Sequence, residues 1–212
     1  MRELYEFGNP SAPNVLIQMV DDHDLEAIAT EVKTIQTLSG ADFCLRAIKV
    51  LSWNHDLSPW KAPAVFGNED FGFGAEAMLA KILPMTVDKE KKYYIGGYSL
   101  AGLFALWAAY QTDVFSGVAA ASPSVWFPGF VDYMQNHEIQ TGMVYLSLGD
   151  REERTRNAVM ATVGEKIRES YALLAAKGIL CALEWNQGNH FKDSEIRTAK
   201  AFSWLLTQNN AD

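Results

Sequence analysis

The sequence predicts an α/β fold in which a mainly parallel sheet is covered by helices on both faces. Short apolar runs alternate with longer segments of helical periodicity along the chain, which is typical of strand-helix-strand units. Six apolar runs are predicted to be strands: residues 15–20, 43–51, 92–97, 114–122, 143–149 and 179–185. With 212 residues, the chain suits one domain that spans 1–212 and buries a sizeable core, and it leaves no segment for a large lid domain.

The helices are predicted from apolar residues spaced three and four positions apart. One such stripe runs over residues 25–35 and ends near Gly40, and another runs over 160–174 with Gly178 as its C-cap. Further helices are expected at 78–82, at 99–110, around Val131 and at 194–206. The segment 99–110 is apolar on every face, so we expect that helix to be buried.

The composition is that of an ordinary globular protein, with 49% hydrophobic and 21% charged residues. The 18 Lys and Arg residues against 26 Asp and Glu give a net charge of −8, which argues against binding the phosphates of nucleic acid. No apolar run approaches the roughly 18–20 residues of a membrane span, and residues 1–14 lack the apolar core of a secretory signal. Cys44 and Cys181 lie in apolar runs, as buried free thiols do in a reducing compartment. We therefore expect a cytoplasmic protein without nucleic-acid or membrane partners.

A serine stands between a predicted strand and a predicted helix, in the stretch GGYSLAG over 96–102. Small residues lie two positions before and two positions after it, at Gly97 and Ala101. This pattern is typical of the nucleophile elbow, a tight turn with no room for large side chains at those two positions. Such a turn lifts the hydroxyl clear of the sheet and directs the Leu100 N–H at a developing oxyanion. The alternative is that Ser99 only caps the helix, but the pattern favours a nucleophile.

A serine nucleophile needs a general base, and the chain has four histidines. His190 follows the last predicted strand, in the stretch NQGNHF over 186–191, where Gly188 allows the loop to fold back towards Ser99. Sites form beyond the carboxyl ends of parallel strands, and the chain order of serine, acid and histidine fits one known arrangement of a serine triad. A helix-capping or surface histidine is the alternative for His190.

The acid that would orient the imidazole is expected in the turn after the strand 143–149. That turn, GDREER over 149–154, offers Asp150, Glu152 and Glu153. At least one of these carboxylates is expected to be solvated and paired with a neighbouring arginine instead. The residue pattern leaves the choice open.

Two other patterns carry little weight. Residues 72–77, GFGAEA, fit a loose dinucleotide fingerprint, but they follow a polar stretch and not a strand. No cluster of His, Cys and Asp has metal-ligand spacing, and neighbouring side chains at 21–24 would point in diverging directions. We therefore expect no metal and no organic cofactor.

The runs GGYSLAGLFALWAA, AASPSVWF, SLGDREE and NQGNHF together resemble the esterase branch of the α/β-hydrolase superfamily, which includes enterochelin-esterase-like, feruloyl-esterase-like and esterase-D-like proteins. The resemblance covers most of the chain and implies hydrolysis of carboxylic esters without a cofactor. It implies that Ser99 is the nucleophile and His190 the base. The acid of this branch often stands three residues after the glycine that closes its strand, which is Glu152 here. Asp150 is the alternative, and some relatives work with a serine and a histidine alone.

The resemblance also implies the other parts of the site. Leu100 matches one oxyanion donor, and the second is expected in the turn after 15–20, at Asp22 or its neighbour Asp21. Many relatives carry His-Gly there, so the acidic pair is a departure. Trp126 in SPSVWF and Trp53 after the second strand are expected to wall the pocket. Trp60 and Trp185 also fall at or beyond the carboxyl ends of predicted strands, whereas Trp107 and Trp204 are predicted to pack in the core.

The sequence therefore predicts a serine esterase that acts on a small-molecule ester and disfavours polyanionic ones. The alternatives are a thioesterase or an acyltransferase that uses the same site, and a non-catalytic binding protein of this fold. No oligomeric state is predicted.

Overall fold

The computed structural model describes residues 3–208, so the ends of the domain predicted over 1–212 lie outside the described residues. A seven-stranded sheet forms the centre, in the order β1-β3-β2-β4-β5-β6-β7. The strands are β1 (Leu4–Gly8), β2 (Asn14–Val20), β3 (Phe43–Lys49), β4 (Lys92–Tyr98), β5 (Phe115–Ala121), β6 (Met143–Gly149) and β7 (Leu180–Asn186). All neighbours pair in parallel except β1 and β3. The predicted α/β architecture is confirmed.

Strand β1 is the strand that the sequence pattern does not predict. It is a five-residue edge strand that pairs antiparallel with β3, Leu4 opposite Ile48 and Gly8 opposite Cys44. None of its residues is fully buried, because only one side of it meets the rest of the sheet. A short half-exposed strand lacks the continuous apolar run that predicts the buried parallel strands.

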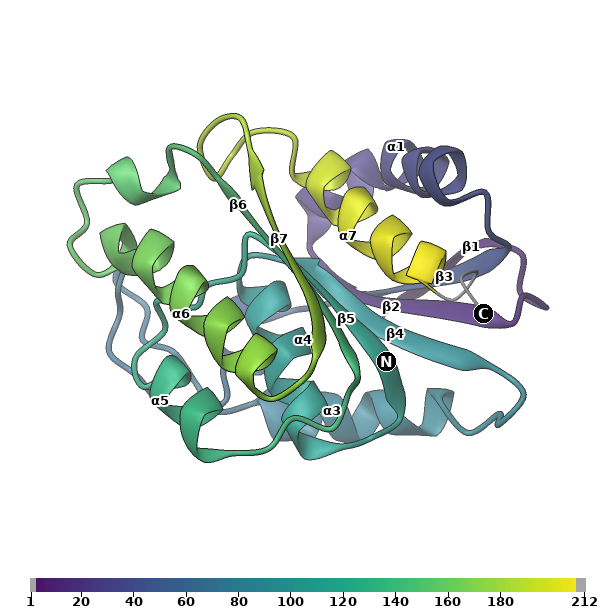
Figure 1. The fold of residues 1–212 in the computed structure, drawn as a ribbon, viewed down its shortest axis with the longest axis horizontal. Coiled ribbons are helices and arrows are strands. Elements are labelled where there is room, and N and C mark those ends of the chain that lie inside the picture. The colour runs from purple at the N-terminus through teal and green to yellow at the C-terminus, as the bar shows by residue number, and fades with distance from the viewer. Residues whose placement is uncertain (1–2, 209–212) are drawn as a thin grey trace.

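The helices form two layers, one on each face of the sheet (Figure 1). Helices α1 (Asp22–Ser39) and α7 (Ser194–Gln208) cover one face. The other face carries α3 (Ala75–Ile82), α4 (Leu100–Gln111), α5 (Phe130–Asn136) and α6 (Val163–Ala176). A single turn, α2 (Trp53–Asp56), lies in the loop after β3, and short 3-10 turns occupy Leu83–Met85, Glu152–Arg154 and Met160–Thr162. Within residues 3–208, the connections between strands carry short helices and loops, and none forms a lid domain.

Helix α4 is buried along its length, as its uniform apolarity predicts. Every residue from Leu100 to Tyr110 is buried, because the helix lies beneath the sheet and is covered in turn by α3 and neighbouring loops. Its first turn is thereby fixed directly below the end of β4. Among the described residues, no helix combines the length and apolarity that crossing a bilayer requires.

Helix α1 begins at a reciprocal capping box made by two of the acidic residues after β2. Asp21 Oδ1 accepts the Asp24 N–H at 2.8 Å, and Asp24 Oδ2 accepts the Asp21 N–H at 3.1 Å. The helix ends at Gly40, whose φ of 61° is left-handed, as predicted. Helix α6, which corresponds to the stripe predicted over 160–174, ends at Ala176, and Gly178 takes a φ of 76° two residues later. The acidic cluster therefore has a structural role at the start of α1.

A polar pair is buried between β2 and α1. Gln18 and Glu31 are each 2% exposed, and Gln18 Nε2 donates to Glu31 Oε2 at 3.2 Å. Among the described residues, neither Gln18 Oε1 nor Glu31 Oε1 has a hydrogen-bond partner. Burial raises the pKa of Glu31 to about 8, against the hydrogen bond from Gln18, which lowers it. The folded protein therefore holds this carboxyl protonated at neutral pH.

Replacing Glu31 with Gln should stabilise the protein at alkaline pH. Between its ordinary pKa of 4.5 and about 8, the unfolded chain ionises Glu31 while the folded protein keeps it protonated, so stability falls as the pH rises through that window. Glu31→Gln removes this loss and should recover at least about 1 kcal/mol, or about 2–4 °C in Tm. Thermal melts at about pH 4 and about pH 9 should show the gain only at the higher pH. Glu26→Gln, an exposed change on the same helix, is the control, and an equal gain at both pH values would contradict the prediction.

Candidate active site

Ser99 lies on a one-residue turn between β4, which ends at Tyr98, and α4, which begins at Leu100. Its backbone angles are φ 58° and ψ −120°, a strained conformation for any residue with a side chain. Gly97 has a φ of 154°, and a Cβ on it would stand 2.7 Å from the Cβ of Ala101. The strand and the helix approach each other so closely that only the smallest residues fit on either side of the serine, as 96–102 predicts.

His190 contacts both Ser99 and Glu152. Its Nε2 is 2.9 Å from Ser99 Oγ, and its Nδ1 is 2.7 Å from Glu152 Oε2. Ser99 follows β4, Glu152 follows β6, and His190 follows β7, so all three come from the carboxyl edge of the sheet. The hydroxyl of Ser99 also lies 3.3 Å from that of Ser124. The structure thus brings the three predicted side chains into one hydrogen-bonded chain.

The structure separates the carboxylates among which the sequence left the choice open. Asp150 accepts the backbone N–H of Gly188 at 2.8 Å, so it ties the turn after β6 to the histidine loop. Glu153 lies 3.5 Å from Arg168. Glu152 is the carboxylate that contacts His190. The three side chains leave the turn in different directions. Their spacing along the sequence does not show which of them faces His190.

The Glu152 carboxylate is enclosed by donors. The whole residue is 8% exposed, and the carboxylate Oε1 accepts from the Gly149 N–H at 2.7 Å and from the Ser122 hydroxyl at 2.8 Å. Burial alone would raise the pKa of this carboxyl, but the hydrogen bond and charge of His190, with the Gly149 N–H, outweigh it and hold the pKa below its ordinary value. The carboxylate therefore stays ionised beside the imidazole.

Arg197 is a part of the site that the sequence analysis missed. Its Nη1 lies 2.8 Å from Glu152 Oε1, and it comes from the first turns of α7, which reads as an ordinary amphipathic helix. An arginine at a position that faces the core is the signal that could have revealed it, because buried charges require partners.

Ser99 and His190 open on a cavity of about 200 Å³ at the carboxyl edge of the sheet. Its lining consists of Asp21, His23, Asp24, Trp53, Tyr98, Ser99, His190, Phe191 and Ser194. No Lys or Arg is among these lining residues, and two carboxylates are. Burial raises the pKa of Asp24 to about 6, with a further contribution from the neighbouring Asp21 carboxylate. Above that pH, the cavity has a negative wall.

The side chain of one predicted site residue, Asp22, points away from the cavity. The carboxylate of Asp22 is 80% exposed and pairs with Lys49 at 2.7 Å, so its side chain does not line the cavity; Asp21 and Asp24 do. As α1 begins, successive side chains turn by about 100°, and this rotation carries Asp22 outwards. Leu100 is the first residue of α4, so its N–H has no acceptor within the helix.

Of the four tryptophans predicted for the pocket, Trp53 lines the cavity. Trp126 does not: it is 7% exposed, and its ring packs against those of Phe66 and Phe71 at centroid distances of 6.1 and 6.0 Å. Trp60 and Trp185 are also outside the cavity. The indole N–H of Trp60 donates to the carbonyl of Pro128, and the guanidinium of Arg168 lies over the ring of Trp185. A position beyond a strand end does not determine where a ring points. Two further aromatic residues line the cavity without having been predicted from the sequence: Tyr98 and Phe191, the latter 89% exposed.

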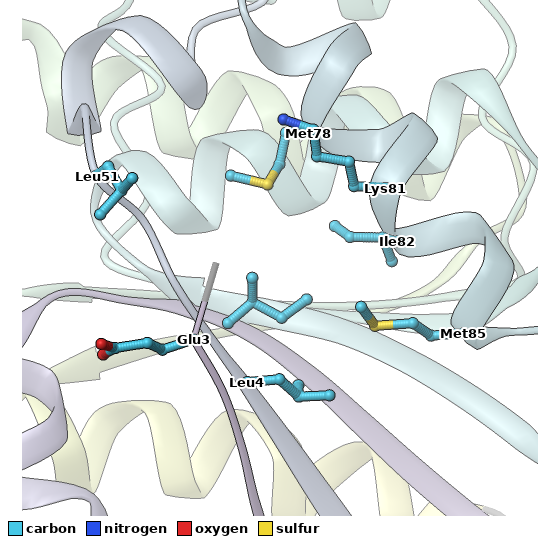
Figure 2. Close-up of a pocket in the computed structure, with 8 residues that line it drawn as sticks. Glu3, Leu4, Leu51, Met78, Lys81, Ile82 and Met85 are labelled. Carbon is cyan, nitrogen blue, oxygen red and sulfur yellow. The ribbon is translucent and has the colours of Figure 1, made fainter. Parts of the chain in front are cut away.

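A larger cavity of about 560 Å³ lies away from these residues, between β1, β3 and α3 (Figure 2). Its lining is mostly aliphatic and includes Leu4, Ile48, Leu51, Met78, Ile82 and Met85, with Glu3 and Lys81 as its charged members. It has no serine or histidine in its lining. The smaller cavity is therefore the candidate active site.

Solved structures share this architecture over almost the whole chain. Siderophore hydrolase EstA from Aspergillus nidulans matches with a TM-score of 0.66 and 20% identity, covering 97% of this chain and 86% of that chain. An IroE-like serine hydrolase from Shewanella oneidensis matches with a TM-score of 0.78 and 15% identity, covering 100% and 77%. The chain has the α/β-hydrolase fold.

A third α/β-hydrolase match is the enterobactin esterase FES from Shigella flexneri, with a TM-score of 0.68 and 15% identity over 98% of this chain. This chain covers 56% of that esterase, about half its length. All three structures come from the branch that the sequence motifs resemble. No protein-family model matches the chain, and no curated protein matches it in sequence. In the α/β-hydrolase fold, a nucleophile stands on the strand-to-helix turn, which is the place of Ser99 here.

The arrangement is suited to acyl transfer. A hydroxyl within hydrogen-bond distance of an imidazole, itself oriented by a buried carboxylate, is the geometry of an activated serine. Within residues 3–208, no group of three or more His, Cys, Asp or Glu side chains is placed to hold a metal ion.

The two neighbouring acids should differ sharply in their effect on Ser99. Glu152→Gln removes the charge beside His190 Nδ1, and we expect the rate of Ser99 labelling by a fluorophosphonate to fall at least roughly a hundredfold. Asp150→Asn is the matched control, because it changes a carboxylate two residues away that accepts the Gly188 N–H and does not contact His190 within residues 3–208; we expect less than about a threefold loss. Both rates are measured by quenching the labelling reaction at successive times and quantifying the labelled protein by mass spectrometry. A greater loss in Asp150→Asn would reverse the assignment.

Proposed function

We propose that the protein is a serine esterase that hydrolyses a small carboxylic ester through an acyl-enzyme, on one domain of residues 1–212. The observation that carries the proposal is the hydrogen-bonded chain from Ser99 through His190 to Glu152, on a strained turn that opens on a cavity. The fold supports it, since the solved structures that share it are described as a siderophore hydrolase, a serine hydrolase and an enterobactin esterase.

In the first half-reaction, Ser99 attacks the ester carbonyl while His190 Nε2 accepts the hydroxyl proton. Glu152 accepts the Nδ1–H of the same ring, which fixes the tautomer and stabilises the imidazolium that forms. The negative charge on the carbonyl oxygen develops at the start of α4, where the Leu100 N–H donates to it. We place the second donor in the turn between β2 and α1, where Asp21 borders the cavity.

The tetrahedral intermediate then collapses to an acyl-enzyme. The alcohol oxygen leaves with the proton from His190 Nε2, and the acyl group remains on Ser99 Oγ. A water molecule enters, gives its proton to His190 and attacks the acyl carbon, and the serine recovers its proton as the acid is released. These steps need no cofactor.

The cavity lining defines the substrate class more closely. About 200 Å³ accommodates a small acyl or alcohol group, and the rings of Trp53 and Phe191 offer flat apolar walls. The carboxylates of Asp21 and Asp24 in the lining oppose an anionic substrate. We place the enzyme in the cytoplasm, since Cys44 and Cys181 are both free thiols.

Ser99→Ala tests the reaction directly. The variant should lose all but a background rate of p-nitrophenyl acetate hydrolysis, at least about a thousandfold in kcat/KM, because the acyl acceptor is gone. Its melting temperature should stay close to that of the wild type, since a hydroxyl at the cavity surface is removed. Fluorophosphonate labelling of the wild type should modify Ser99 and no residue in the variant. Unchanged hydrolysis by Ser99→Ala would end the proposal.

Substrate charge tests the negative wall. We expect neutral p-nitrophenyl butyrate to be preferred over mono-p-nitrophenyl succinate, and the preference should grow as the pH rises through about 6 and Asp24 ionises. Asp24→Asn should reduce the preference by roughly tenfold at about pH 8, since it removes a charge from the cavity and keeps an acceptor for the helix cap. Asp22→Asn is the matched control outside the cavity. An equal reduction in both variants would assign the effect to net charge.

A further inference from the structure

Arg197 is the largest fully buried side chain of the described structure, at 1% exposure. A guanidinium cannot lose its charge in a protein, so its burial is costly unless it is paired and hydrogen-bonded. Its partner is the Glu152 carboxylate, whose side chain is 3% exposed. The pair therefore lies inside the protein, directly behind the proposed catalytic histidine.

The two oxygens of Glu152 have separate partners. Oε2 contacts His190 Nδ1. Oε1 accepts from Arg197 Nη1 at 2.8 Å, together with the Gly149 N–H and the Ser122 hydroxyl. Three donors on one oxygen fix the rotation of the carboxylate and leave the other oxygen facing the imidazole.

The second arm of the guanidinium holds the loop that carries the base. Nη2 donates to the carbonyl of Asn189 at 3.0 Å and reaches that of Gln187 at 3.4 Å. Nη1 also lies 3.0 Å from the hydroxyl of Tyr98, which in turn donates to the carbonyl of His190 at 2.7 Å. Burial raises the pKa of Tyr98 to about 12, so this hydroxyl keeps its proton.

The absence of a side chain at Gly149 leaves room for the contact between Arg197 and Glu152. A Cβ on that residue would stand 2.9 Å from Arg197 Nη1, 2.9 Å from Glu152 Oε1 and 2.4 Å from the carbonyl of Gly188. Any side chain there would separate the turn after β6 from the histidine loop. Gly149, Arg197 and Glu152 are thus packed as one unit.

We propose that Arg197 is a positioning residue of the esterase reaction: it fixes the Glu152 carboxylate towards His190 and holds the 187–190 loop against it. This inference rests on the proposed function, because the reaction that Arg197 would support is the proposed ester hydrolysis. The geometric part rests on the contacts of Arg197. A lysine would supply a charge but not both arms, since an ammonium is a point charge and the guanidinium is a planar fork. The fork is what joins the acid to the loop of the base.

Arg197→Met and Arg197→Lys test this role, with Lys200→Met as the matched control. Lys200 lies one turn further along α7 and ties it to β7 through Glu184 and Asn186, without contacting Glu152. The first readout is the low-field proton NMR resonance of a histidine Nδ1–H bonded to a carboxylate, assigned through its loss in Glu152→Gln. The second is the rate at which a fluorophosphonate labels Ser99. The third is the division of the effect between kcat and KM for p-nitrophenyl acetate.

We expect Arg197→Met to broaden or lose the resonance, to slow labelling at least about tenfold and to lower kcat with little change in KM. Arg197→Lys should recover part of the labelling rate, and Lys200→Met should keep both signals even where it lowers Tm. The proposal is overturned if Arg197→Met matches Lys200→Met in resonance and labelling rate. Should Arg197→Met fail to fold, Arg197→Lys decides, and wild-type behaviour in all three readouts overturns the proposal.

The two proposals can fail separately. If the wild type hydrolyses no ester, the esterase proposal fails, while the resonance needs no substrate and still reports whether Arg197 orients Glu152. If the wild type is active and the resonance survives in Arg197→Met, the esterase proposal stands and the positioning role is rejected.

Discussion

Helix α4 begins one residue after β4 ends, and the chain can make that turn only where side chains are nearly absent. The close contact between Gly97 and Ala101 forces Ser99 into a positive φ, and the burial of α4 holds the turn in place. Because the sheet is parallel, the same edge also receives the turns after β6 and β7, which carry Glu152 and His190. The turn thus places Ser99 at the edge to which the parallel sheet also brings the loops of Glu152 and His190.

The sequence predicts the parts of the site that depend on local geometry. Ser99 is recognisable because a tight turn demands particular neighbours, and His190 because its loop follows a buried strand. The parts that depend on side-chain direction are not predictable in this way: Asp22 and Trp126 stand beyond the correct strands but point to Lys49 and into an aromatic cluster. Arg197 contacts a residue 45 positions away, and no pattern within a helix encodes such a partner.

Charge is arranged in two layers around Ser99. Beneath His190, a buried carboxylate and a buried guanidinium neutralise each other, so the interior carries little net field from the pair. At the cavity, Asp21 and Asp24 stand without a cation among the lining residues. The inner pair thus fixes the position of side chains, whereas the outer carboxylates set the electrostatic potential that a molecule approaching Ser99 meets.

The capping box of α1 and the wall of the cavity share the same two carboxylates. Asp21 and Asp24 hold each other's backbone N–H at the start of the helix, and the same two carboxylates border the cavity. If the proposed esterase were selected for a different ester, selection would therefore act on residues whose loss costs about 1 kcal/mol of helix stability. Asn, Ser or Thr would remove charge from this wall and keep a hydrogen-bond acceptor for the cap, so the helix cap favours these substitutions as the routes by which the proposed enzyme would change its substrate.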